Sequence, residues 1–248
     1  MDENVLKLKA AEHVRLVTVF DNYEYRPELE TGWGFSCLVK INDKAVFFDT
    51  GADGAVLLSN LERLELSPSA ADAVVFSHPH FDHTGGLAAL LSENSEVTVY
   101  GHTGFSSGFQ SKLESRSTRY VEVSSAYKLG ESAGVTGPVG GGIREQAFFV
   151  STDKGLVVIT GCAHPGVVRM VEKAKEVTGE KIYLVLGGFH LGGAPRERLL
   201  ETAEELKKQG VKKAAPCHCS GDKCRQVFAE VFDDDYVDNG VGRVIEIP

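Results

Sequence analysis

Several features that define other protein classes are missing from this chain of 248 residues. No apolar run approaches the roughly 20 residues that a membrane-spanning helix needs. The first ten residues, MDENVLKLKA, carry acidic side chains where a signal peptide is positively charged. We therefore expect a protein that acts in the cytoplasm and has no membrane partner.

Basic residues are also scarce. Lys and Arg number 26 against 35 Asp and Glu, which gives a formal net charge of -9. A protein that binds duplex nucleic acid usually carries a basic stripe, so a nucleic-acid partner is disfavoured. The only local excess of positive charge is formed by Lys112, Arg116 and Arg119, which we expect to help hold a small anionic substrate.

Cysteine is present in an odd number, five, without the spacing of a disulfide framework, which favours a reducing compartment. Cys217, Cys219 and Cys224 form a C-x-C-x4-C set that resembles no common zinc ribbon. Its one obvious fourth ligand is His218. We therefore predict reduced cysteines beside a ligand histidine in place of a separate zinc site.

The chain is long enough to bury a sizeable core without disulfides, and no linker divides it. We predict a single domain over residues 1–248. Short β-branched or aromatic runs alternate with helical patterns, which indicates an α/β (α+β) fold. The predicted strands are 13–20, 35–41, 45–49, 73–77, 97–100, 120–123, 147–151, 156–160, 182–186, 213–216 and 243–247. The predicted helices are 52–64, 85–91, 167–178, 195–209 and 222–231.

Two connecting segments have their own signals. Asn42 and Asp43 separate two predicted strands and indicate the turn of a hairpin. Residues 103–142 are rich in Ser and Gly and end in GPVGGG, so we predict a loop or lid there, apart from the short strand 120–123.

The segment most informative about function is AVVFSHPHFDHTGG, residues 73–86. An apolar run, typical of a buried strand, is followed within six residues by His78, His80, Asp82 and His83. Three imidazoles and a carboxylate suit a divalent ion such as zinc. A histidine-rich loop without metal is the alternative, but three of the eight histidines of the chain lie in this window with an acid between them. We predict a metal site.

Three further histidines, His164, His190 and His218, each follow a predicted strand. Strand ends on one edge of a sheet gather their side chains into one region. A single such histidine would more often be a hydrogen-bonded structural residue. Three repetitions, in a chain that already has a metal motif, favour a functional role.

The motif His78-x-His80-x-Asp82-His83, with FFDTG at residues 47–51, resembles the signature of the metallo-β-lactamase superfamily. This resemblance implies a four-layer αββα sandwich with metals at one edge of the paired sheets. The segments TGCAHPG (160–166), GGFHL (187–191) and PCHCSG (216–221) are similar to one branch of the superfamily. That branch includes dihydropterin–ribofuranosylaminobenzene 5′-phosphate synthases of methanopterin biosynthesis, and the similarity spans residues 19–220.

The resemblance also implies a ligand set for two divalent metal ions. We expect zinc, with manganese or iron as alternatives, because the same donors serve all three. The implied metal ligands are His78, His80 and His164 for the first ion, and Asp82, His83 and His218 for the second.

Other residues receive roles by the same resemblance. Asp49 would support the metal site from behind, and His190 would donate a proton near the scissile bond. Asp82 and His190 are thus the implied catalytic residues. At the strand end where the family has a bridging Asp, this chain offers Cys162 or His164, and both alternatives stay open.

The expected activity is metal-dependent hydrolysis by a hydroxide held between two ions, because coordination lowers the pKa of water. The substrate would be a small phosphorylated or pterin-like molecule. Two alternatives are a metal-dependent nuclease or phosphodiesterase acting on nucleic acid, and a pterin-type synthase of methanopterin biosynthesis. The sequence does not distinguish between substrates or between oligomeric states.

Overall fold

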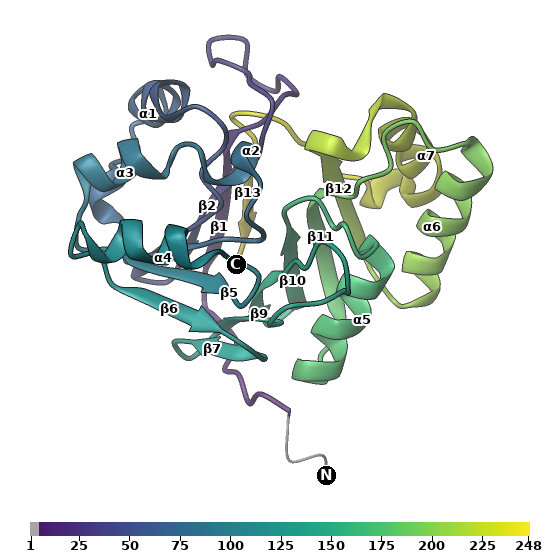
Figure 1. Ribbon diagram of the computed structural model, residues 1–248. Coiled ribbons are helices and arrows are strands. Elements are labelled where there is room, and N and C mark those ends of the chain that lie inside the picture. The colour runs from purple at the N-terminus through teal and green to yellow at the C-terminus, as the bar shows by residue number, and fades with distance from the viewer. Residues whose placement is uncertain (1–4) are drawn as a thin grey trace. The chain divides into compact units, whose positions relative to one another are not determined.

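The computed structural model describes residues 5–248, which form two compact units. We call residues 13–124 with 240–248 the N-terminal unit, and residues 5–12 with 125–239 the C-terminal unit. Each contains one β-sheet and its own helices (Figure 1). The assignment of residues 1–248 to a single domain stays a prediction.

The N-terminal unit contains a seven-stranded mixed sheet in the order β13-β1-β2-β3-β4-β5-β6. Strands β13 to β3 are antiparallel, and β3 to β6 run parallel. The strands are β1 (Val14–Phe20), β2 (Ser36–Ile41), β3 (Lys44–Phe48), β4 (Ala73–Val75), β5 (Thr98–His102), β6 (Tyr120–Val123) and β13 (Val244–Ile247). The helices are α1 (Gly54–Arg63), η1 (Pro68–Ala70), α2 (Phe81–Thr84), α3 (Leu87–Glu93) and α4 (Ser107–Glu114).

The core of this unit lies between its sheet and three of its helices. Leu57 of α1, Leu90 of α3 and Leu113 of α4 pack in one cluster with Phe47 and Val74 of the sheet. Apolar residues recur at helical spacing in these segments, so each helix buries one face. This packed core holds β4 in place, and the histidine motif follows directly after β4.

The C-terminal unit contains a six-stranded mixed sheet in the order β12-β11-β10-β9-β8-β7. Strands β10, β11 and β12 are parallel and the others antiparallel. The strands are β7 (Tyr127–Leu129), β8 (Ala133–Val135), β9 (Phe148–Thr152), β10 (Gly155–Thr160), β11 (Ile182–Gly188) and β12 (Lys213–Cys217). The helices are α5 (Val167–Thr178), α6 (Arg196–Lys208), η2 (His218–Ser220), α7 (Asp222–Phe232) and η3 (Asp233–Asp235).

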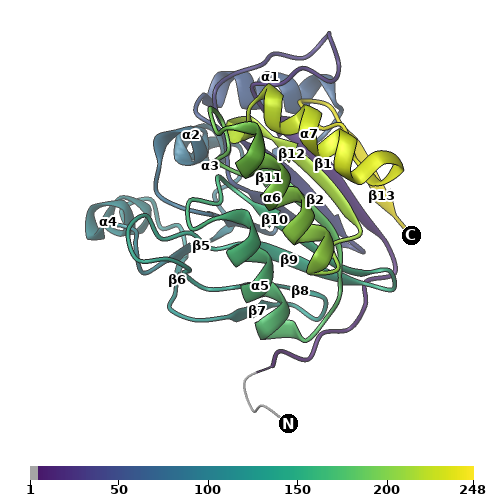
Figure 2. The same ribbon diagram turned by 90° about the vertical axis from the view of Figure 1, so that its right-hand side faces the viewer.

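Helices α5, α6 and α7 lie side by side over this second sheet (Figure 2). Met170, Leu199 and Phe228, one from each helix, are buried in a cluster with Val158 and Val185 of the central strands. Each of the three parallel strands β10, β11 and β12 leads into a loop or turn, so all three carboxyl ends lie at the same edge. That edge carries the functional candidates of this unit.

The predicted strands and the five predicted helices are present, with boundaries that differ by a few residues. The hairpin is confirmed, because Ile41 pairs with Lys44 and Asn42 adopts φ 52° at its turn. Among residues 5–248 no helix combines the length and the apolar character needed to cross a membrane.

The prediction of a loop or lid over residues 103–142 is wrong. This segment contains α4, β7 and β8. Helix α4 is capped by Ser106, whose Oγ accepts from Phe109 N at 3.2 Å, and it buries Leu113. Gly130, at φ 77°, lies in the turn between β7 and β8. The apolar spacing of Phe105, Phe109 and Leu113 was the helical signal, obscured by the surrounding Ser and Gly residues.

Candidate metal centre

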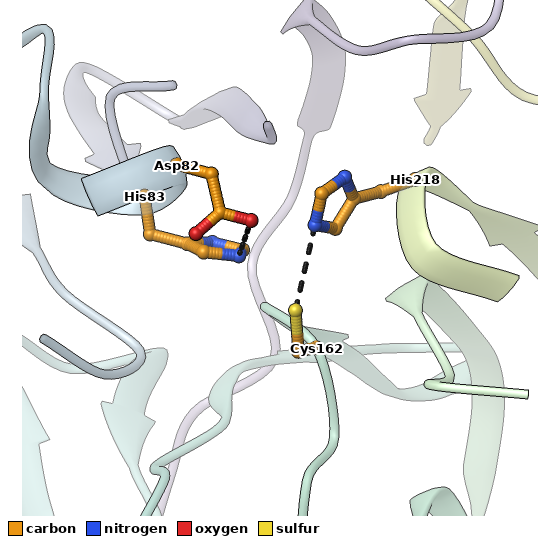
Figure 3. A group of neighbouring side chains, drawn as sticks. All are labelled: Asp82, His83, Cys162 and His218. Atoms are coloured by element: carbon orange, nitrogen blue, oxygen red, sulfur yellow. Dashed lines mark hydrogen bonds and ion pairs between the residues drawn. The ribbon is translucent and has the colours of Figure 1, made fainter. Parts of the chain in front are cut away.

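In the N-terminal unit, the motif predicted to bind metal begins just beyond β4. His78 and His83 are fully buried, His80 is partly exposed, and Asp82 lies in the first turn of α2. His78 Nε2 lies 3.0 Å from His80 Nδ1, and the rings of His78 and His83 are 4.3 Å apart. His83 Nε2 faces Asp82 Oδ2 at 3.6 Å (Figure 3). The structure therefore brings all four motif side chains together.

Asp49, predicted to support these residues from behind, is fully buried at the end of β3. Its Oδ1 accepts a hydrogen bond from Ser77 N at 2.7 Å. Its Oδ2 accepts from Ser77 Oγ at 2.6 Å and lies 2.7 Å from His83 Nδ1. One carboxylate thus fixes both the strand end and an imidazole of the motif.

These contacts determine where the protons on two histidines lie. A carboxylate only accepts hydrogen bonds, so His83 Nδ1 donates to Asp49. Ser77 Oγ already donates to Asp49, so His78 Nδ1, 2.9 Å from that oxygen, donates to it. In their neutral forms both rings keep an unprotonated Nε2, which is the form that binds a metal.

Close backbone packing also shapes this motif. Thr50 N and Thr50 Oγ1 donate to His83 O at 2.7 and 3.1 Å. A Cβ on Gly85 would lie 2.2 Å from Ala52 O, and one on Gly86 would lie 2.2 Å from Thr50 O. The two glycines of the HTGG sequence therefore let α2 approach the loop that follows β3.

In the C-terminal unit, candidate ligands follow β10, β11 and β12, as the sequence predicts. Cys162 Sγ lies 3.4 Å from His218 Nε2 (Figure 3). The rings of His164 and His190 are 4.3 Å apart. Ligand atoms of Cys162, His190 and Cys219 all lie within 4.8 Å of one another. The three strand-end histidines therefore gather with two thiols at one edge of this sheet.

Sequence reasoning missed Glu145 and the part that it plays here. Its side chain is fully buried, and Oε1 accepts from the backbone N–H groups of Gly161, Cys162 and Ala163 at 2.8–2.9 Å. Oε2 accepts from His164 N at 3.0 Å. A single carboxylate thus holds the loop that presents Cys162 and His164. Nothing in the local sequence signals this role, because the contacts span 16–19 residues.

We predict that Glu145→Gln destabilises this loop. The amide nitrogen of Gln cannot accept the hydrogen bond from one of the buried N–H groups, and an unsatisfied buried donor costs about 1–3 kcal/mol. Chemical denaturation should show that loss in the free energy of unfolding, and metal titration should show weaker binding. Glu176→Gln, an exposed change on α5, is the control. Wild-type stability and metal affinity in Glu145→Gln would contradict the assignment.

The five cysteines lie in contrasting environments, although all are buried and reduced. A hydrogen bond from Cys162 holds the pKa of the Cys219 thiol well below its usual range, with further contributions from His190 and His218. Burial raises the pKa of Cys37 and of Cys224 to about 12. Cys219 therefore interacts with Cys162, whereas the sequence spacing placed it in one C-x-C-x4-C set with Cys217 and Cys224.

This contrast predicts which cysteine reacts first with an alkylating agent. The thiolate is the nucleophile, so a group with a lowered pKa is ionised at pH 7 and one with a raised pKa is protonated. In metal-free protein at pH 7, iodoacetamide should modify Cys219 before Cys37 or Cys224. Peptide mass spectrometry over a time course would measure the order, and equal rates at Cys37 and Cys219 would contradict it.

The donors in both units fit a borderline-soft divalent metal. The N-terminal unit offers imidazole and carboxylate ligands, and the C-terminal unit offers imidazole and thiol ligands, which are the groups that zinc takes in proteins. Two of the imidazoles are already held in the ligating form by the Asp49 network. The chain therefore carries clusters of His, Asp and Cys suited to metal binding.

The chain is similar to several known proteins. A synthase of 7,8-dihydropterin-6-methyl-4-(β-D-ribofuranosyl)-aminobenzene-5′-phosphate from Methanocaldococcus jannaschii is 28% identical, over 98% of this chain and 99% of its own. A solved structure described as a metal-dependent hydrolase of the β-lactamase superfamily matches with a TM-score of 0.78 and 24% identity, over 94% of this chain and 99% of that one. The metallo-β-lactamase fold protein YhfI from Bacillus subtilis matches with a TM-score of 0.70 and 17% identity, over 94% and 99%.

These matches confirm the predicted αββα fold class and the resemblance to the dihydropterin synthase branch. A family model described as the metallo-β-lactamase superfamily matches residues 34–178, more than half of the chain. The matched range includes the whole histidine motif as well as Cys162 and His164. The chain belongs to the metallo-β-lactamase superfamily, a family of metal-dependent enzymes.

Proposed function

We propose that this enzyme is a metal-dependent hydrolase whose centre holds two divalent ions, and that its substrate is a small phosphorylated or pterin-like molecule. The observation that carries the proposal is the Asp49–Ser77–His78 and Asp49–His83 network. It leaves an unprotonated Nε2 on two buried imidazoles. Histidines that bind a metal usually donate their other ring N–H to a carboxylate, carbonyl or hydroxyl in this way, which fixes the ring and the ligating nitrogen.

The proposed ligands come from both units, as membership of the superfamily implies. His78, His80 and His164 would hold one ion, and Asp82, His83 and His218 the other. Cys162, 3.4 Å from His218, is the further ligand that we assign in place of a bridging Asp, because a thiolate is a strong zinc ligand. Zinc is the proposed metal, with manganese and iron as alternatives.

Divalent ions in such a centre supply activation of water and stabilisation of the developing negative charge. The remaining steps fall to side chains of the enzyme. His190 is accessible to a substrate, because its side chain is exposed at the end of β11. It would protonate the leaving-group oxygen, and the exposed cations Lys112 and Arg116, in α4 and just after it, would hold the anionic part of the substrate.

A second candidate function is synthesis of a pterin product. It is favoured by the relative from Methanocaldococcus jannaschii, whose name describes a synthase that makes an aminobenzene-5′-phosphate compound. Assaying this enzyme with dihydropterin and ribofuranosylaminobenzene phosphate compounds, beside simple phosphate esters, would separate the two functions. Formation of a condensed pterin product would support the synthase function, and release of phosphate or an alcohol from the esters would support the hydrolase function.

Elemental analysis of protein purified without chelators or added metal is the first test. About two equivalents of metal per chain, followed by turnover of phosphate esters or cyclic phosphodiesters, is the expected result. Absence of metal even after dialysis against zinc and manganese would overturn the proposal. An activity on nucleic acid that weakens steeply with salt would favour the phosphodiesterase alternative.

A further inference from the structure

A pocket outside the histidine clusters lies within the N-terminal unit, between α4 and the helices α2 and α3. Its volume is about 180 Å³. Most of its lining is apolar and includes Phe81, Leu87, Leu91, Phe109 and Leu113. All of these residues belong to the same unit, so the shape of the pocket depends on this unit alone.

Phe81 connects this pocket to the metal motif. It stands between His80 and Asp82 in the sequence, yet its side chain is 72% exposed and lines the pocket. Because the Phe81 side chain is exposed, packing in the core does not explain an aromatic residue at this position. Exposed apolar groups that gather around a hollow mark a binding surface.

The rim of the pocket is positively charged. Lys112, in the last turn of α4, and Arg116, one turn further on, both line it and are both exposed. Among residues 5–248 neither has an ion-pair partner within 4.0 Å. Two cations beside an aromatic surface match a ligand that carries an anionic group next to an apolar one.

We propose that this pocket binds a single aromatic ring bearing an anionic group, such as a phosphate or a carboxylate. The ring would lie between Phe81 and Phe109, and the anion would lie against Lys112 and Arg116. The volume decides the size of the ring, because dry cavities of about 150 Å³ accept benzene. A volume of about 180 Å³ is therefore enough to hold one such ring.

This inference rests on the proposed function in one respect, since the ring would be part of the substrate. It narrows that substrate to aromatic anions whose ring is held beside the metal motif. It also refines the expectation about three cations. Lys112 and Arg116 line the pocket, whereas Arg119 is exposed and is not among the lining residues that the structure describes.

The test uses phenylphosphonate, which carries one ring and a phosphate-like group that is not hydrolysed, and methylphosphonate, which lacks the ring. Binding to the full-length protein is followed by the amide shifts of α3 and α4 in NMR spectra. Phenylphosphonate should shift these amides and bind at least about fivefold more tightly than methylphosphonate. Equal affinity for the two probes would overturn the proposal.

Matched variants locate the binding. Ala88→Leu fills the pocket from an exposed lining position on α3, and Ser92→Leu adds the same side chain one turn further along that helix, at an exposed position that does not line the pocket. Ala88→Leu should weaken phenylphosphonate binding by about fivefold or more, and Ser92→Leu should not. Lys112→Met with Arg116→Met should weaken it, whereas Arg119→Met should leave it unchanged. An unchanged affinity in Ala88→Leu would overturn the proposed location.

Binding is read here without turnover, so the two proposals fail separately. A protein that holds no metal but binds phenylphosphonate in this pocket would contradict the hydrolase proposal alone. A protein with two metals that prefers methylphosphonate, or shows no shifts in α3 and α4, would contradict the pocket proposal alone.

Discussion

Replacing Asp82 with Ala is expected to remove bound metal and to lower hydrolytic activity more than about 100-fold, since even outer-shell changes at metal sites cost about 10–100-fold. Asp82 supplies the one carboxylate of the motif, and its Oδ2 lies 3.6 Å from His83 Nε2. Without it, His83 keeps its orientation through Asp49 but loses its neighbouring ligand. Elemental analysis and steady-state rates on a phosphate ester, measured on the same preparations, would show both losses.

Glu93→Ala is the matched control for this change, because it removes an exposed carboxylate from α3 in the same unit. It should retain metal and activity. Circular dichroism should show Asp82→Ala folded, since Asp82 is partly exposed and lies in a short helix. Wild-type metal content in Asp82→Ala would remove this residue from the ligand set.

The cluster in the N-terminal unit could be predicted because its geometry is local. His78, His80, Asp82 and His83 lie within six consecutive positions at the end of one strand. Any fold that places α2 after β4 brings them together. The support from Asp49 was implied by the resemblance. In the structure it comes from the parallel pairing of β3 with β4, because Phe48 pairs with Val75 and these residues come just before Asp49 and the histidine motif.

The cluster in the C-terminal unit was only partly predictable, because its contacts depend on the register of parallel strands. The sequence places a histidine after each of three strands but does not show which cysteine faces them. Cys162 and Cys219 are 57 residues apart, and the turn at His218, with φ 50°, directs Cys219 toward Cys162. Cys224, which sequence spacing grouped with Cys219, is buried instead in the helical core.

Buried acids were the hardest group to predict. Glu145 looks like any surface acid in the sequence, since Arg144 precedes it and Gln146 follows. Its role arises from four backbone N–H groups of a loop that no local pattern can foresee. Each unit thus uses one buried carboxylate, Asp49 or Glu145, to fix the segment that carries its candidate ligands, and only the first lies in a recognisable motif.

His190→Asn is expected to lower the rate constant for hydrolysis by about 100- to 10,000-fold, the usual contribution of a general acid, while metal content stays unchanged. Asn is chosen because His190 adopts φ 51°, a left-handed conformation that Asn tolerates better than Ala. Rates on esters with good and poor leaving groups, and metal analysis of each preparation, form the measurement. The loss should be largest for poor leaving groups, which need the proton most.

His164→Asn provides the contrast that makes this prediction decisive. The rings of His164 and His190 are only 4.3 Å apart, so both variants perturb the same edge of the sheet. Because His164 is a proposed ligand, the His164→Asn enzyme should lose metal, whereas the His190→Asn enzyme should lose only the proton transfer. Metal loss in His190→Asn would instead make His190 a ligand together with Cys162 and Cys219, whose ligand atoms lie within 4.8 Å of it. The proton would then have to come from another group.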